Sequence, residues 1–300
     1  MTIYTGVGVA LCTPFDSKGN FNGLVYEKLV DFQVEQGTDA IVSCGTTGES
    51  TTLTNEEHIE VVRTAVTAAK KAGKKYGRKV PVIAGAGGND TAACISTGKA
   101  LQQAGADALM YVTPYYNKTS QRGLVTHYSA IAANVDLPIV VYNVPPRTAL
   151  NMLPKTLAEI AKLPNIQAVK ETSSDINQIA QVVELCANDI DIYVGNDSEI
   201  LPTLALGGKG VISTMGNIAP AGIKSIITKF FAGDLEGSRK AQLGILPMTR
   251  LLFADVNPMP VKAALRMMGF DVGNCRLPLV DIDPTLAEEL QTEMRRYGLV

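Results

Sequence analysis

The feature that most constrains the fold is a repeated alternation of short β-branched runs with amphipathic segments, which continues to about residue 230. Eight strand–helix units of this kind predict a (β/α)8 TIM barrel. A doubly wound sheet is the alternative, but its first strand–helix turn normally carries the spacing G-x-G-x-x-G, which Thr13-Pro14-Phe15-Asp16 lacks. The expected strands are Val7–Phe15, Ala40–Gly45, Val80–Gly85, Ala108–Thr113, Pro138–Val144, Ile166–Thr172, Ile190–Gly195 and Gly210–Thr214.

The residues after the eighth unit have a helical pattern that continues to the end of the sequence. We expect Pro247, Pro258 and Pro260 to break this stretch into three helices, because proline disrupts a helix interior. No linker-like tract precedes the stretch. The sequence therefore predicts a catalytic barrel over residues 1–233 and a three-helix extension, packed on the barrel, over residues 234–300.

Composition excludes several classes of protein. A net charge of −2 and a pI near 5.8 argue against nucleic acid or an anionic membrane surface as a partner. No apolar run has the length of a membrane span, and Met1–Tyr4 carries no basic region, so we expect a cytoplasmic protein without a signal peptide. The five cysteines form no C-x-x-C pair and there are only two histidines, which argues against a disulfide framework and a metal site.

Lys170 stands near the end of the expected strand Ile166–Thr172, where a buried parallel strand is normally apolar. Burial of a lysine is costly, and such an amine loses affinity for a proton, which suits imine-forming catalysis. The alternative is that the strand ends one residue early and Lys170 points to solvent, and the local context alone slightly favours that alternative.

Three further sites lie at expected strand ends, where the active site of such a barrel is found. The loop Gly45–Ser50 has glycines around two threonines, so it is either an anion-binding nest or an ordinary turn. Tyr142 is expected to face the barrel interior, and Arg147 follows two prolines in the next loop. Tyr115 and Tyr116 are either rim packing or an interface anchor. The coincidence of these sites with Lys170 favours a catalytic lysine.

Six motifs are spread over nearly the whole chain: Thr13–Phe15, 45–50, 112–117, 142–145, Val169–Glu171 and Asn257–Lys262. Taken together, these motifs resemble the dihydrodipicolinate synthase family, within the pyruvate-dependent class I aldolase (N-acetylneuraminate lyase) superfamily. The sialic acid lyase and sugar-acid aldolase branches of that superfamily share several of the motifs.

The resemblance implies a lyase that condenses pyruvate with L-aspartate 4-semialdehyde to 4-hydroxy-tetrahydrodipicolinate, in lysine and diaminopimelate biosynthesis. Lys170 forms a Schiff base with pyruvate, so neither a metal nor an organic cofactor is expected. Tyr142 is implied as a proton shuttle, linked to Thr46 and to Tyr116 of a neighbouring subunit. The implied assembly is a homotetramer, arranged as a dimer of dimers.

The resemblance also implies the substrate contacts. Thr46 and Thr47 hold the carboxylate of pyruvate, and Arg147 receives the carboxylate of the aldehyde. Gly195 and Ile212 line the site through their backbone carbonyls. Arg147 favours this reaction over the alternative, a related lyase acting on a 2-keto-3-deoxy sugar acid or sialic acid, whereas the intact lysine, tyrosine and threonine disfavour a non-catalytic keto-acid sensor.

Members of the family that lysine inhibits carry a histidine and a glutamate where this sequence has Asn55 and Ala93. The glutamate pairs with the ammonium group of the effector, and its loss removes a charge-assisted contact. We therefore expect weak or absent inhibition by lysine.

Overall fold

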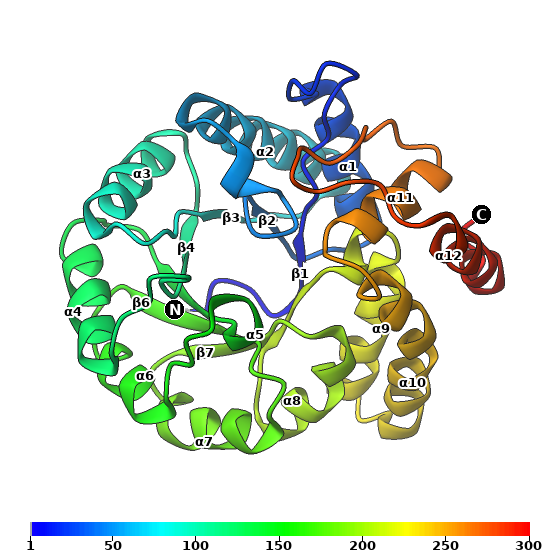
Figure 1. Cartoon of the computed structure of the whole chain (residues 1–300). Coiled ribbons are helices and arrows are strands. Elements are labelled where there is room, and N and C mark those ends of the chain that lie inside the picture. The colour runs from blue at the N-terminus through cyan, green and yellow to red at the C-terminus, as the bar shows by residue number, and fades with distance from the viewer. Residues whose placement is uncertain (1) are drawn as a thin grey trace.

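The computed structural model describes residues 2–300 and contains the predicted closed barrel. Its eight strands are all parallel and follow one another around the barrel in sequence order, with β8 closing onto β1 (Figure 1). The strands are shorter than expected by a few residues, because the chain leaves the hydrogen-bonded sheet before the apolar run ends and continues as a loop. They are β1 Gly6–Ala10, β2 Ala40–Ser43, β3 Val82–Gly85, β4 Ala108–Val112, β5 Ile139–Asn143, β6 Ile166–Glu171, β7 Asp191–Val194 and β8 Gly210–Ser213.

A ring of helices surrounds the barrel, and a short one, α5, follows β5 (Figure 1). None of the helices in residues 2–300 is both long enough and apolar enough to cross a membrane. The helices of this ring are α1 Gly23–Glu35, α2 Asn55–Tyr76, α3 Thr91–Gln103, α4 Gln121–Ala132, α5 Pro145–Thr148, α6 Pro154–Ile160, α7 Ile176–Cys186, α8 Ile200–Leu206 and α9 Pro220–Phe231, with single turns at η1 Ser50–Thr52, η2 Asp197–Glu199 and η3 Met215–Asn217.

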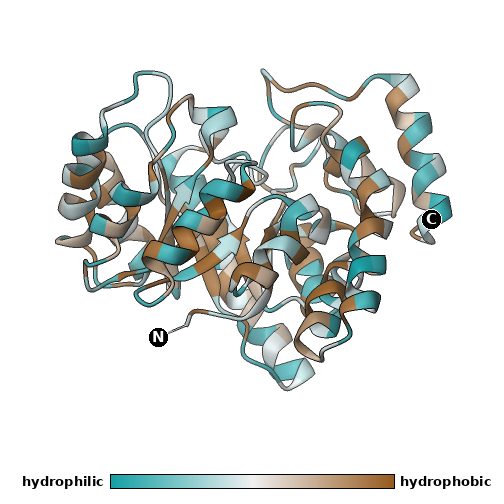
Figure 2. Cartoon of the chain, turned by 90° about the horizontal axis from the view of Figure 1, so that it is seen from below, coloured by the Kyte–Doolittle hydropathy of each residue, from teal (hydrophilic) through white to brown (hydrophobic). Residues whose placement is uncertain are grey.

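Alternate residues of each strand face two separate apolar cores, as the pleat requires. Val141 and Val169 belong to the larger core between the barrel and its helices, whereas Val140 and Tyr142 belong to the core inside the barrel. Figure 2 shows the apolar strands enclosed by helices that turn hydrophilic residues outward. Since both faces of the sheet are covered, any polar side chain within the barrel requires a specific reason.

The start of α2 follows from its sequence. The Thr54 hydroxyl accepts a hydrogen bond from the Glu57 amide at 3.2 Å, and the Glu57 carboxylate accepts one from the Thr54 amide at 2.9 Å. This is the capping box that Thr54 and Glu57 predict. The helix continues to Tyr76 because its buried face, which includes Ala69 and Gly73, extends that far.

The C-terminal residues form three helices beside α1 and α9 (Figure 1). They are α10 Leu235–Leu252, α11 Met259–Met267 and α12 Pro284–Tyr297. The prediction that Pro247 breaks a helix is wrong, because Pro247 lies inside α10. Buried side chains on both sides of it, among them Ile245 and Met248, hold the two halves in place despite the missing hydrogen bond. The segment 268–283 between α11 and α12 contains no helix.

Candidate active site

Two adjoining cavities open at the carboxyl ends of the strands. One has a volume of about 570 Å³ and is lined by Lys170, and the other has a volume of about 300 Å³ and is lined by Tyr115. Because parallel strands present their carboxyl ends at one rim, residues from β2, β5, β6 and β7 meet here. The residues that line both cavities are Thr46, Tyr142, Val144, Arg147, Val256 and Asn257.

Lys170 lies inside the barrel and is only 6% exposed. It pairs in register with Tyr142 on β5 and with Tyr193 on β7, and its Nζ lies 4.3 Å from the centre of the Tyr142 ring. The alternative of a solvent-facing lysine is therefore wrong, since β6 continues through Glu171. No carboxylate of the described chain forms an ion pair with Lys170, so its amine faces the cavity without a charged partner.

Gly195, directly after β7, makes room for the lysine. A Cβ at this position would lie 2.8 Å from Lys170 Cε and 2.1 Å from Thr172 Oγ1. Its backbone amide donates to the Glu171 carbonyl at 2.8 Å, which holds the loop against the end of β6. Ile212 on β8 is fully buried in the inner core and is not among the residues that line either cavity.

The predicted proton relay is incomplete within one chain. Tyr142 is 5% exposed and shares both cavities with Thr46, but no hydrogen bond between described residues joins their side chains. Tyr116 is 95% exposed and has a φ of 55°, in the left-handed region. Its neighbour Tyr115 lines the smaller cavity instead. The donation of Tyr116 to another subunit stays a prediction.

The loop Gly45–Ser50 presents backbone donors to the cleft. The amides of Gly48 and Glu49 close turns onto the carbonyls of Gly45 and Thr46, each at 3.1 Å. By contrast, the amides of Thr46 and Thr47 donate to no acceptor in residues 2–300. Two consecutive free N–H groups beside a cavity are suited to bind an anion such as a carboxylate.

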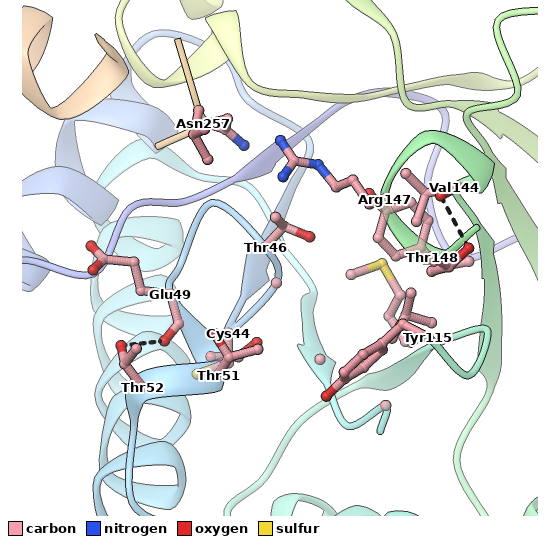
Figure 3. A pocket seen from close by; sticks show the side chains of 18 of the residues that line it. Cys44, Thr46, Glu49, Thr51, Thr52, Tyr115, Val144, Arg147, Thr148 and Asn257 are labelled. Atoms are coloured by element: carbon pink, nitrogen blue, oxygen red, sulfur yellow. Dashed lines mark hydrogen bonds between the residues drawn. The ribbon is translucent and has the colours of Figure 1, made fainter. Parts of the chain in front are cut away.

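Arg147 lies on α5 and is exposed. Its guanidinium extends across the smaller cavity toward Thr46 and Asn257 (Figure 3). The two prolines before it begin the helix and fix the backbone, so the guanidinium is presented from a stiff support. A guanidinium in this position is able to form a forked contact with a carboxylate.

Two buried carboxyl groups support the strand ends next to Lys170. Burial raises the pKa of Glu171, and hydrogen bonds from Asn143, Ser173 and Gln178 oppose that rise. Burial likewise raises the pKa of Asp197. Donors on Met215, Ser213 and Thr214, together with the charge of Lys170, act in the opposite direction. Both carboxylates accept several hydrogen bonds from the protein. They therefore hold the backbone at the strand ends and do not contact the substrate.

Asn257 is a site residue that the sequence pattern does not single out, although it lies in the motif Asn257–Lys262. It precedes α11, lines both cavities and is 5% exposed. Its Nδ2 donates to Thr47 Oγ1 at 2.9 Å, and its Oδ1 is buried without a partner. Only the placement of α11 over the barrel brings it here, so no local pattern gave a signal. Across residues 2–300, no cluster of His, Cys, Asp and Glu has the arrangement of a metal site.

Comparison with known proteins agrees with this geometry. The model of the dihydrodipicolinate synthetase family matches residues 3–296. The 4-hydroxy-tetrahydrodipicolinate synthase of Lachnoclostridium phytofermentans is 48% identical over 301 residues, and the alignment covers 100% of both chains.

Solved structures give the same result. The dihydrodipicolinate synthase of Thermotoga maritima superposes with a TM-score of 0.95 at 40% identity, covering 99% of this chain and 100% of the other. That of Cyanidioschyzon merolae, solved with lysine bound, has a TM-score of 0.95 at 38% identity, with 100% of each chain covered. The chain therefore belongs to the dihydrodipicolinate synthetase family.

Proposed function

We propose that this protein condenses pyruvate with L-aspartate 4-semialdehyde to 4-hydroxy-tetrahydrodipicolinate, as a lyase of lysine and diaminopimelate biosynthesis. The observation that carries the proposal is the unpaired Lys170 amine, enclosed beside Tyr142 at the carboxyl end of the barrel. The name shared by full-length relatives at 42–48% identity supports the same reaction.

The Lys170 amine attacks the ketone carbon of pyruvate, and water leaves to give an imine. The protonated imine nitrogen acts as an electron sink, so the methyl group loses a proton and an enamine forms. The enamine carbon then attacks the aldehyde, and the amino group of the product displaces Lys170 as the ring closes. Lys170 is thereby regenerated, and we expect no metal or organic cofactor to take part.

Tyr142 is the group placed to carry these protons, because it lies beside the Lys170 amine within the cleft. Thr46 is its expected partner, and Tyr116 of a second subunit is expected to complete the relay. An isolated chain leaves Tyr116 in solvent, so the proposal includes an assembly of at least two subunits, and a homotetramer built as a dimer of dimers. We place the enzyme in the cytoplasm.

The substrates are oriented by charge. The free amides of Thr46 and Thr47 are placed to receive the carboxylate of pyruvate. Arg147 is placed to receive the carboxylate of the aldehyde from the opposite wall. Gly195 lines the larger cavity, and we expect its backbone carbonyl and that of Ile212 to face the bound substrate.

Inhibition by lysine is expected to be weak or absent. Ala93 on α3 has no carboxylate to pair with the ammonium group of an effector, and Asn55 opens α2 where inhibited relatives carry histidine. An inhibition constant for lysine below the millimolar range would refute this part of the proposal.

The test is a parallel assay of two reactions, the condensation of pyruvate with aspartate semialdehyde and the cleavage of 2-keto-3-deoxy sugar acids. We expect turnover only in the first reaction, because Arg147 suits a small aldehyde that carries a carboxylate. Faster cleavage of a sugar acid or of sialic acid would assign the chain to the alternative reaction.

A further inference from the structure

Two strained residues flank the loop that carries Thr46 and Thr47. Cys44 has a φ of 55° and Glu49 a φ of 53°, both in the left-handed region that side chains disfavour. Such residues persist only where the surrounding structure holds them, and they concentrate at functional sites. Glycine or asparagine would adopt this conformation with less strain than glutamate, so the glutamate side chain itself requires an explanation.

The Glu49 side chain is fixed from the C-terminal extension. Its Oε1 lies 2.6 Å from Lys262 Nζ on α11, an ionic contact rather than a well-aligned hydrogen bond. Its Oε2 accepts a hydrogen bond from the Arg276 amide at 2.9 Å. The side chains of Glu49 and Lys262 are 1% and 0% exposed. Lys262 Nζ also donates to the Asn274 carbonyl at 3.1 Å and lies 4.3 Å from the centre of the Phe15 ring.

We propose that Lys262 and Glu49 are positioning residues for pyruvate. Their ion pair holds Glu49 in the left-handed turn, and this turn keeps the Thr46 and Thr47 amides directed into the cleft. The hydrogen bond from Asn257 to Thr47 fixes the same loop from the same extension. The inference rests on the proposed function, since it assumes that these amides receive the carboxylate of pyruvate.

A contribution to folding stability does not by itself explain the buried ion pair between Glu49 and Lys262. A buried ion pair is often replaced by apolar residues of similar volume without loss of stability. A pair retained only for packing would therefore be exchangeable for two methionines with no change in ligand binding. A positioning pair would not be exchangeable, because apolar contact does not specify the orientation of the turn.

The measurement is the pyruvate concentration that gives half-maximal covalent adduct when the protein is reduced with borohydride. For Glu49→Met/Lys262→Met we expect a folded protein with a lowered thermal midpoint, because the Arg276 amide and the Asn274 carbonyl lose their partners. We expect its half-saturating concentration to be higher by about tenfold to a hundredfold, which corresponds to the loss of one to two charge-assisted contacts. A parent-like half-saturating concentration would overturn the proposal. If the double variant does not fold, Glu49→Gln decides in the same way: it keeps the side-chain volume and an acceptor for the Arg276 amide but removes the charge.

Asp281→Asn is the matched control. It removes an ion pair within the same extension, between Asp281 and Arg266 at 2.8 Å, that does not touch the loop. We expect its half-saturating pyruvate concentration to equal that of the parent, and an increase as large as that of the double variant would overturn the proposal. Failure of the proposed function is distinguishable. A parent protein that forms no pyruvate adduct at any concentration would overturn the imine chemistry itself, whereas a parent that forms the adduct but does not turn over aspartate semialdehyde would overturn only the assigned second substrate.

Discussion

The substitution Gly195→Ala isolates the placement of Lys170 from the stability of the fold. The added methyl would lie 2.8 Å from Lys170 Cε, whereas ordinary contact begins at 3.4 Å, so the lysine has to withdraw by about 0.6 Å. The methyl also lies 2.1 Å from Thr172 Oγ1, but this hydroxyl has no hydrogen-bond partner and turns away without losing one. Overpacking of this kind costs about 1–3 kcal/mol of unfolding free energy.

A shift of this size moves the nucleophile away from the ketone carbon. Misplacement on the ångström scale costs about a hundredfold in rate, or about 2.7 kcal/mol of activation free energy. The variant should remain folded, because domains are stable by about 5–15 kcal/mol. The assay is the rate at which borohydride traps the pyruvate adduct, measured beside a thermal melt. Gly244→Ala, whose methyl would meet nothing within 4 Å, is the control. Trapping by Gly195→Ala at the parent rate would refute the reasoning.

The remaining predictions concern the second substrate, the neighbouring subunit and pH. Arg147→Met should raise the KM for aspartate semialdehyde by about tenfold to a hundredfold and leave pyruvate trapping unchanged; equal effects on both would contradict its role. Tyr116→Phe should lower turnover by about a hundredfold, and a small loss would count against its donation. Burial lowers the pKa of His58 and of His127, the only two histidines, so the folded state binds fewer protons than the unfolded state just below pH 6.5. The unfolding free energy should therefore fall as pH falls through that window, by up to about 1.4 kcal/mol per pH unit per histidine. Imidazole NMR signals that titrate at or above pH 6.5 would contradict this.

The sequence predicted the barrel because its information is local. Short β-branched runs and amphipathic helices carry their periodicity within each segment, and Lys170 was conspicuous because it interrupts an apolar run. The strand ends were placed too far along the chain, as in Val7–Phe15, since apolar residues continue beyond Ala10 into the loop. The predicted break at Pro247 is wrong because the packing that supports α10 on both sides of it comes from tertiary contacts.

The supporting contacts of the site were not predictable in the same way. Asn257 reaches Thr47 across 210 positions of sequence, and Lys262 reaches Glu49 only once α11 has docked on the barrel. A lysine within a helix gives no local sign that it will be buried against a distant carboxylate. The loop Gly45–Ser50 was recognisable as a possible anion site, but the position of its free amides beside a cavity is visible only in three dimensions.

The central claim is that Lys170 forms the covalent bond to pyruvate. The most direct measurement is incubation with pyruvate, reduction with borohydride and peptide mapping by mass spectrometry. We predict an adduct on Lys170 and none on Lys262, the other buried lysine, whose amine is already paired with Glu49. An adduct on a different lysine, or no adduct, would contradict the account.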